Sequence, residues 1–161
     1  MAKAIGISKA ALLDHFDGKP ALFTAMLEAI LERCGLLISA NAKRPFPSSE
    51  ARFLALSLAL SKQPIFDAFR FLRSEQHHLL PEQQGLLRHS GNELLFYPIK
   101  KLFAVALERQ ELRTPDTGMA SDLFLGFCVL VSSMRSMESG VPTVARHKEM
   151  FAMFWHGAAV N

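Results

Sequence analysis

Apolar residues recur with the period of an α-helix along almost the whole chain, and no segment shows the sustained alternation of a β-strand. Between residue 19 and about residue 40, they form one broad stripe, which predicts a long helix. Further helices are predicted over residues 48–62, 65–80, 116–139 and 143–157. We therefore expect an all-α helical bundle.

Prolines mark several of the predicted boundaries. The stretch 41–47 contains two prolines and two basic residues and should be a loop. Pro81 opens a segment that reaches Gln110, and Pro98 within it should kink or break the helix, because proline lacks the N–H that the ladder needs. The helix over 48–62 is apolar on nearly all sides, so it should run through the middle of the bundle.

Composition narrows the class of protein. Half of the 161 residues are apolar, which is enough for a core, and the net charge of +3 permits a polyanionic partner without demonstrating one. Cys34 and Cys128 are far apart in apolar stretches and predict reduced core residues. The apolar run over 123–131 is well short of the roughly 20 residues of a membrane span. We expect a cytoplasmic protein that does not cross a membrane.

The first residues combine several features of a helix-turn-helix. Gly6 lets the chain reverse between two helices, and Ser8 can cap a short helix over residues 8–16. Leu12 and Phe16, four residues apart, would anchor that helix and leave its opposite face free. Lys19, at the start of the next helix, is placed for a phosphate contact.

Residues 4–23 resemble the second half of the helix-turn-helix of TetR/AcrR-family transcriptional regulators, with Ala4, Gly6, Ser8, Lys9, Leu12, His15, Phe16, Lys19, Ala21 and Leu22 in register. The resemblance implies that the helix from Ser8 enters the major groove of DNA. The residues it implies for DNA binding are Ser8, Lys9, Ala10, Ala11, Leu13, Asp14, His15 and Lys19.

The chain departs from the family's pattern in three ways. Leu13 stands where the family usually has a tyrosine that contacts phosphate, and Asp14 brings a negative charge toward a polyanion. The family's head also has a first helix and the opening half of a second one before the segment that Met1 begins. The resemblance therefore implies a partial DNA-binding domain over residues 1–40, with a linker helix from about 19, and a body over 41–161.

The resemblance implies a body that binds a small molecule and dimerises. In the family, the last two helices pair with their copies, which here predicts a homodimer through residues of about 116–157. We expect a repressor that binds palindromic operator DNA and is released by a small apolar or aromatic effector. Candidate effector contacts are the large apolar residues Met26, Phe53, Phe66, Phe69, Phe96, Tyr97, Phe103 and Phe124.

Other classes of function have less support in the sequence. There is no HExxH motif, no Gly-x-Ser-x-Gly motif and no phosphate-binding glycine loop, so we expect no catalytic residues, no metal ligands and no cofactor. His77, His78, His89 and His147 are expected at the surface. Two alternatives stay open: an interaction module that dimerises without binding DNA, and a carrier of small molecules built on the same body.

Overall fold

The computed structural model describes residues 16, 18–75, 77, 79–136 and 143–158. Its helices are α2 (Gly18–Lys43), α3 (Ser49–Leu60), α4 (Ile65–Glu75), α5 (Pro81–Gly91), the π-helix η3 (Asn92–Phe96), α6 (Tyr97–Glu108), α7 (Thr117–Ser136) and α8 (Val144–Ala158). Turns join them, and the described residues contain no β-sheet. The predicted all-α fold is confirmed.

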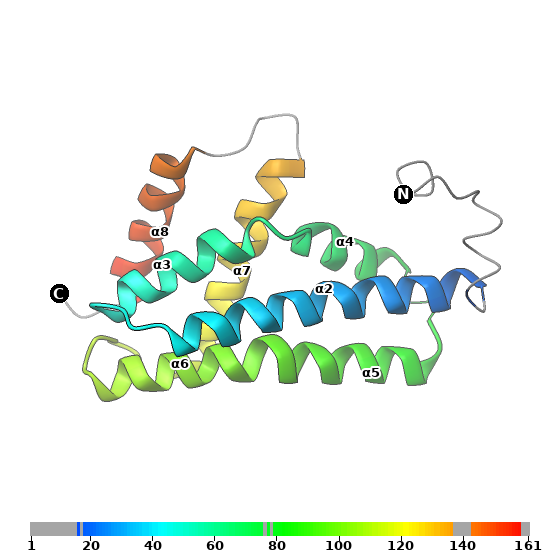
Figure 1. Ribbon diagram of the computed structural model, residues 1–161, viewed down its shortest axis with the longest axis horizontal. Helices are drawn as coiled ribbons and strands as arrows, with labels where there is room; N and C mark the ends of the chain where they lie inside the picture. The colour runs from blue at the N-terminus through cyan, green and yellow to red at the C-terminus, as the bar shows by residue number, and fades with distance from the viewer. Residues whose placement is uncertain (1–15, 17, 76, 78, 137–142, 159–161) are drawn as a thin grey trace.

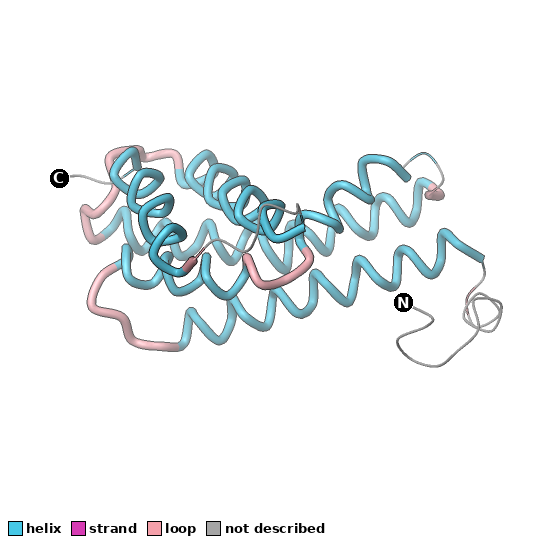
Figure 2. Tube along the Cα trace, turned by 90° about the horizontal axis from the view of Figure 1, so that it is seen from above, coloured by secondary structure: helices cyan, strands magenta, loops and turns pink. Residues whose placement is uncertain are grey.

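Two long parallel rods form one side of the molecule. α2 runs beside a continuous helical rod made of α5, η3 and α6, in the same direction and over most of its length (Figure 1). α3, α4, α7 and α8 cover the other side, as the view from above makes clear (Figure 2). α7 packs against α3, α4, α6 and α8, so it is the element that ties this second layer together.

Aromatic rings fill the centre of the core. Phe53 of α3 is fully buried and stacks on Phe103 of α6, with ring centroids 4.0 Å apart and planes 19° apart. Phe124 of α7 meets Phe53 edge-on at 5.1 Å, and Trp155 of α8 lies 5.6 Å from it. Such pairs add to the free energy gained from burial alone. α3 is therefore the central helix of this part of the bundle, as its sequence predicted.

A hydrogen-bonded clasp fixes the end of α2, which extends a few residues beyond the predicted boundary. Arg52 Nη1 donates to the carbonyl oxygens of Asn41, at 2.7 Å, and Ala42, at 3.3 Å, and Nη2 donates to that of Arg44 at 3.1 Å. The carbonyls of Asn41 and Ala42 belong to the last turn of α2, whose carbonyls lack the usual i+4 partners within the helix, and Arg44 follows α2 directly. The Arg52 guanidinium also lies 4.9 Å from the centre of the Phe46 ring.

α4 is shorter than predicted, because it ends at Glu75 instead of near Leu80. Leu79 is buried and packs with Leu27 of α2 and Leu87 of α5. The chain must leave the α4 axis to bring Leu79 into this cluster. Pro81 can then take the first turn of α5, where its missing N–H costs nothing.

Pro98 was predicted to kink or break the helix, and it does not break the second rod. Instead, the turn before it widens into η3, where the Tyr97 N–H donates to the carbonyl of Asn92, five residues earlier. A proline ring collides with the carbonyl four residues before it, and a wider turn relieves that contact. The rod continues through α6.

By length and composition, an 18-residue window of α7, Thr117–Met134, could also cross a membrane, although its uninterrupted apolar run is short. Buried core helices of water-soluble proteins pass the same test. Nearly half of this window, 44%, is buried inside the bundle. The packing of α7 against four other helices accounts for the buried part of its apolar surface.

Candidate functional site

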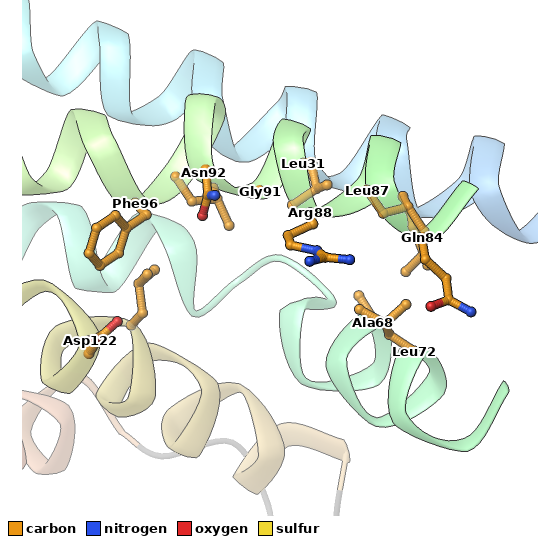
Figure 3. A pocket seen from close by; sticks show the side chains of 13 residues that line it. Leu31, Ala68, Leu72, Gln84, Leu87, Arg88, Gly91, Asn92, Phe96 and Asp122 are labelled. Carbon is orange, nitrogen blue, oxygen red and sulfur yellow. The ribbon is translucent and has the colours of Figure 1, made fainter. Parts of the chain in front are cut away.

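A cavity of about 520 Å³ lies between the two layers. Its walls come from α2, α4, α5, η3 and α7 (Figure 3). The lining residues are Leu27, Leu31, Ala68, Leu72, Gln84, Leu87, Arg88, Gly91, Asn92, Leu95, Phe96, Asp122 and Leu125. Most of them are apolar, and the volume is within the range of about 300–1,000 Å³ that small-molecule sites occupy.

The wall formed by the second rod is held close to α2 at one point. A methyl group added at Gly35 of α2 would lie 3.2 Å from Leu94 Cδ2 and 3.4 Å from the Leu94 carbonyl oxygen. Any larger residue at this position would crowd Leu94 where α2 approaches η3. Because Leu27 and Leu31 of α2 also line the cavity, a ligand there would contact both rods.

Four polar side chains interrupt the apolar walls. Arg88 and Asn92 project from α5 and η3 toward the space in front of α4 and α7, and Asp122 reaches from α7 on the other side (Figure 3). The side-chain amide of Gln84 is already hydrogen-bonded within the protein, since its Nε2 donates to the Leu79 carbonyl at 3.0 Å. No described residue forms a hydrogen bond or ion pair with the side chains of Arg88, Asn92 or Asp122.

A second, more superficial groove of about 750 Å³ adjoins the cavity. It is lined by residues of α4 and α7, which are Arg70, Arg73, Ser74, Asp122, Leu125, Gly126 and Val129. Asp122 and Leu125 belong to both spaces, so the two meet at these residues. The groove adds two arginines to the charged groups around the cavity.

The predicted effector contacts fall into separate places. Phe96 lines the cavity, and Tyr97 beside it is 44% exposed. Phe53, Phe103 and Phe124 are fully buried, pack against one another at the centre of the core and do not line the cavity. Met26 is half-buried on α2 and is not among the cavity residues. The side chains of Phe66 and Phe69 lie outside what the structure describes.

Lys19 is the one predicted DNA contact that lies within the described residues. Ser8, Lys9, Ala10, Ala11, Leu13, Asp14 and His15 lie outside the described residues. Lys19 is exposed at the start of α2, and its Nζ is 5.0 Å from the centre of the Phe23 ring. The described residues do not test whether the DNA-binding domain is partial, so this stays a prediction.

Large apolar side chains are exposed along one side of α7 and on α8. Met119, Leu123 and Leu130 are 48%, 55% and 52% exposed, and they recur at helical spacing on α7. Val144 and Met153 of α8 are 61% and 80% exposed. We call these residues together the α7–α8 stripe; its continuous part lies on α7, because Val144 and Met153 are nine residues apart and face opposite sides of α8. Gly126 lies among its α7 members and would meet nothing within 4 Å if it carried a methyl group.

His147 is buried, so the prediction that it lies at the surface is wrong. Its ring is 3% exposed, lies edge-on to Phe127, and has its Nε2 2.8 Å from Ser57 Oγ. Ser57 Oγ donates to the Leu54 carbonyl at 2.9 Å, which leaves this oxygen to accept from the Nε2–H of a neutral ring. Burial lowers the pKa of His147 below its ordinary value. His77 and His89 are exposed as predicted, and His78 is outside the described residues.

Several solved structures with this arrangement of helices are TetR-family regulators of transcription. A TetR-family regulatory protein from Rhodococcus RHA1 superposes with a TM-score of 0.76 at 13% identity, over 99% of this chain and 85% of its own. A TetR/AcrR-family regulator from Thermobifida fusca gives 0.70 at 20% identity, over 97% and 83%. The chain has the TetR-family fold. A putative TetR-family regulator from Mesorhizobium loti gives 0.62 at 18% identity, over 99% and 84%.

Sequence comparison is less sensitive for this chain than comparison of structures. No protein-family model matches the sequence, and a search of curated proteins finds no match. Identities of 13–20% with the TetR-fold structures explain why, since helical packing is retained long after most side chains have changed. The fold of the described residues is therefore the one that the resemblance of residues 4–23 implies.

Proposed function

We propose that this protein is a ligand-responsive transcriptional regulator that binds palindromic operator DNA as a dimer and releases it when a small molecule occupies the cavity. The observation that carries the proposal is that Leu27 and Leu31 of α2 line the cavity. α2 is the helix that begins directly after the segment resembling a DNA-reading head. A ligand that contacts α2 can therefore change the position of that head.

Two further observations support the proposal. The fold is that of TetR-family regulators, and the α7–α8 stripe is a surface on which a second copy could bury apolar side chains. A dimer would hold two recognition helices at a fixed separation that matches half-sites about one helical turn apart. Ligand and operator would then be coupled reciprocally, typically by about 1–3 kcal/mol.

DNA binding is tested by fluorescence anisotropy with the intergenic DNA beside the gene, at several salt concentrations. Lys19→Gln should weaken binding for all sequences alike and reduce the salt dependence by about one counterion, because it removes a phosphate contact. Lys43→Gln, at the other end of α2, is the matched control and should change neither quantity. If the unmodified protein binds the intergenic DNA no more tightly than unrelated DNA at any salt concentration, the regulator proposal fails.

Dimerisation is tested by sedimentation velocity. Leu123→Lys places a charge in the α7–α8 stripe and should shift the protein toward the monomer. Leu36→Lys is the matched control, since Leu36 is 73% exposed on α2, outside the stripe. Equal sedimentation of both variants and the unmodified protein would place the dimer interface elsewhere.

The cavity lined by α2 favours the regulator over the DNA-free interaction module, because that alternative gives the cavity no role. The small-molecule carrier shares the cavity with our proposal. The anisotropy titration separates them, since a carrier would bind ligand but not DNA.

A further inference from the structure

We infer that the cavity binds an amphipathic anion, with an apolar body between the two layers and a carboxylate or similar group paired with Arg88. The inference deepens the proposed function, because it names the class of ligand that the proposed effector site takes. It starts from the position of Arg88, which lies on the cavity wall between Leu31 and Leu87 on one side and Ala68 and Leu72 on the other (Figure 3).

The side chain of Arg88 is exposed at the cavity wall. It forms neither a hydrogen bond nor an ion pair within the part of the chain that the structure describes. Elsewhere in the fold, Arg52 uses its guanidinium to satisfy three carbonyl groups. A guanidinium presents a planar set of donors that matches a carboxylate, and a charged hydrogen bond of this kind is stronger than a neutral one. Arg88 is therefore available to a ligand.

The sum of charges around the two adjoining spaces favours an anion. Arg88 lines the cavity, Arg70 and Arg73 line the groove, and Asp122 is the carboxylate where the two spaces meet. Three cations face one anion. Arg70 is only loosely neutralised, because its Nη2 is 3.9 Å from Asp67 Oδ1 and both side chains are about half exposed or more. A cationic ligand would meet repulsion from three groups and attraction from one.

The apolar walls determine the rest of the ligand. Leu27, Leu31, Leu72, Leu87 and Leu95 surround the space beside Arg88. Asn92 adds an amide close to the same wall, also without a partner among the described residues. A ligand that buries a hydrocarbon or aromatic body there and directs one anionic group to Arg88 matches both the apolar walls and the cation beside them. A fully polar anion would leave the leucines hydrated.

The test compares three probes with the same ten-carbon tail, which are decanoate, decanol and decylamine. Isothermal titration calorimetry of the full chain near neutral pH should rank decanoate first, about tenfold or more tighter than decanol, with decylamine weakest. Arg88→Gln should remove the preference for decanoate over decanol and leave decanol binding unchanged. Arg113→Gln, an exposed arginine outside both spaces, is the matched control and should keep the preference.

A variant on the opposite wall sharpens the test. Asp122→Asn removes the one carboxylate and should keep or increase the preference for decanoate. Equal binding of decanoate and decanol by the unmodified protein, or a preference that survives Arg88→Gln, would overturn the inference while the cavity itself remained a binding site. Binding of none of the three probes would overturn it as well. Because these titrations contain no DNA, they can fail or succeed independently of operator binding.

Discussion

The contact between α2 and η3 can be tested by a single methyl group. Gly35→Ala puts a Cβ 3.2 Å from Leu94 Cδ2, 3.3 Å from Leu94 Cβ and 3.4 Å from the Leu94 carbonyl oxygen. Two of these atoms are fixed by the backbone of the second rod, so a change of side-chain rotamer cannot relieve the crowding. The rods must separate slightly or accept strain.

The magnitude follows from two opposing effects. Replacing glycine by alanine inside a helix stabilises a protein by about 1 kcal/mol, and overpacking costs about 1–3 kcal/mol. Gly85 in α5 provides the matched control, because a methyl group there would meet nothing within 4 Å. Gly85→Ala should therefore raise the free energy of unfolding by about 1 kcal/mol, whereas Gly35→Ala should leave it unchanged or lower it by up to about 2 kcal/mol.

Urea titrations followed by circular dichroism measure both variants, at one protein concentration because the proposed dimer would make stability concentration-dependent. The transition midpoint should rise for Gly85→Ala and stay or fall for Gly35→Ala, with similar slopes. Leu94→Ala added to Gly35→Ala should recover part of the loss, because it removes one of the three close atoms. If Gly35→Ala raised the midpoint as much as Gly85→Ala, the two rods could not be in close contact at this point.

Three further predictions concern the buried core. Burial lowers the pKa of His147, so as the pH falls this histidine is protonated in the unfolded chain before it is protonated in the folded protein. The free energy of unfolding should therefore decrease as the pH falls below about 6.5, by up to about 1.4 kcal/mol per pH unit. Urea titrations over a pH series should show that His147→Gln removes this part of the slope, and an unchanged slope would argue against a neutral buried ring. Phe53→Ala should lower the free energy of unfolding by about 3–5 kcal/mol, and Phe96→Ala at the cavity wall by clearly less, so equal losses by calorimetry would contradict the described core. Burial raises the pKa of the Cys34 thiol to about 11 and also raises that of Cys128. Neither should react with Ellman's reagent near neutral pH until urea unfolds the protein, and rapid reaction of the folded protein would show that a thiol is accessible.

The helices themselves could be predicted from the sequence because each depends on a local signal. Ser48 caps α3, with its Oγ accepting from the Ala51 N–H at 3.1 Å, as expected of a serine before an apolar helical run. Errors arose where a distant contact decides the outcome. α4 ends early because Leu79 packs against α2, and His147 is buried because Ser57, 90 residues away, supplies its partner.

The cavity wall on the second rod could not be read from helical periodicity alone, because η3 changes the turn between Asn92 and Phe96. Gln84, Arg88, Asn92 and Phe96 are spaced four residues apart and all line the cavity. In an uninterrupted α-helix, each step of four residues turns the side chain by about 40° beyond a full circle, so Phe96 would lie about 120° away from Gln84. The π-helix adds residues to one turn and rotates Phe96 back toward the face of Arg88. A search for helical periodicity assumes a constant turn and places Phe96 well away from Gln84. Pro98, which favours the wider turn, was the one signal in the sequence for η3, and the wider turn brings Phe96 back toward the face of Arg88 while the rod continues.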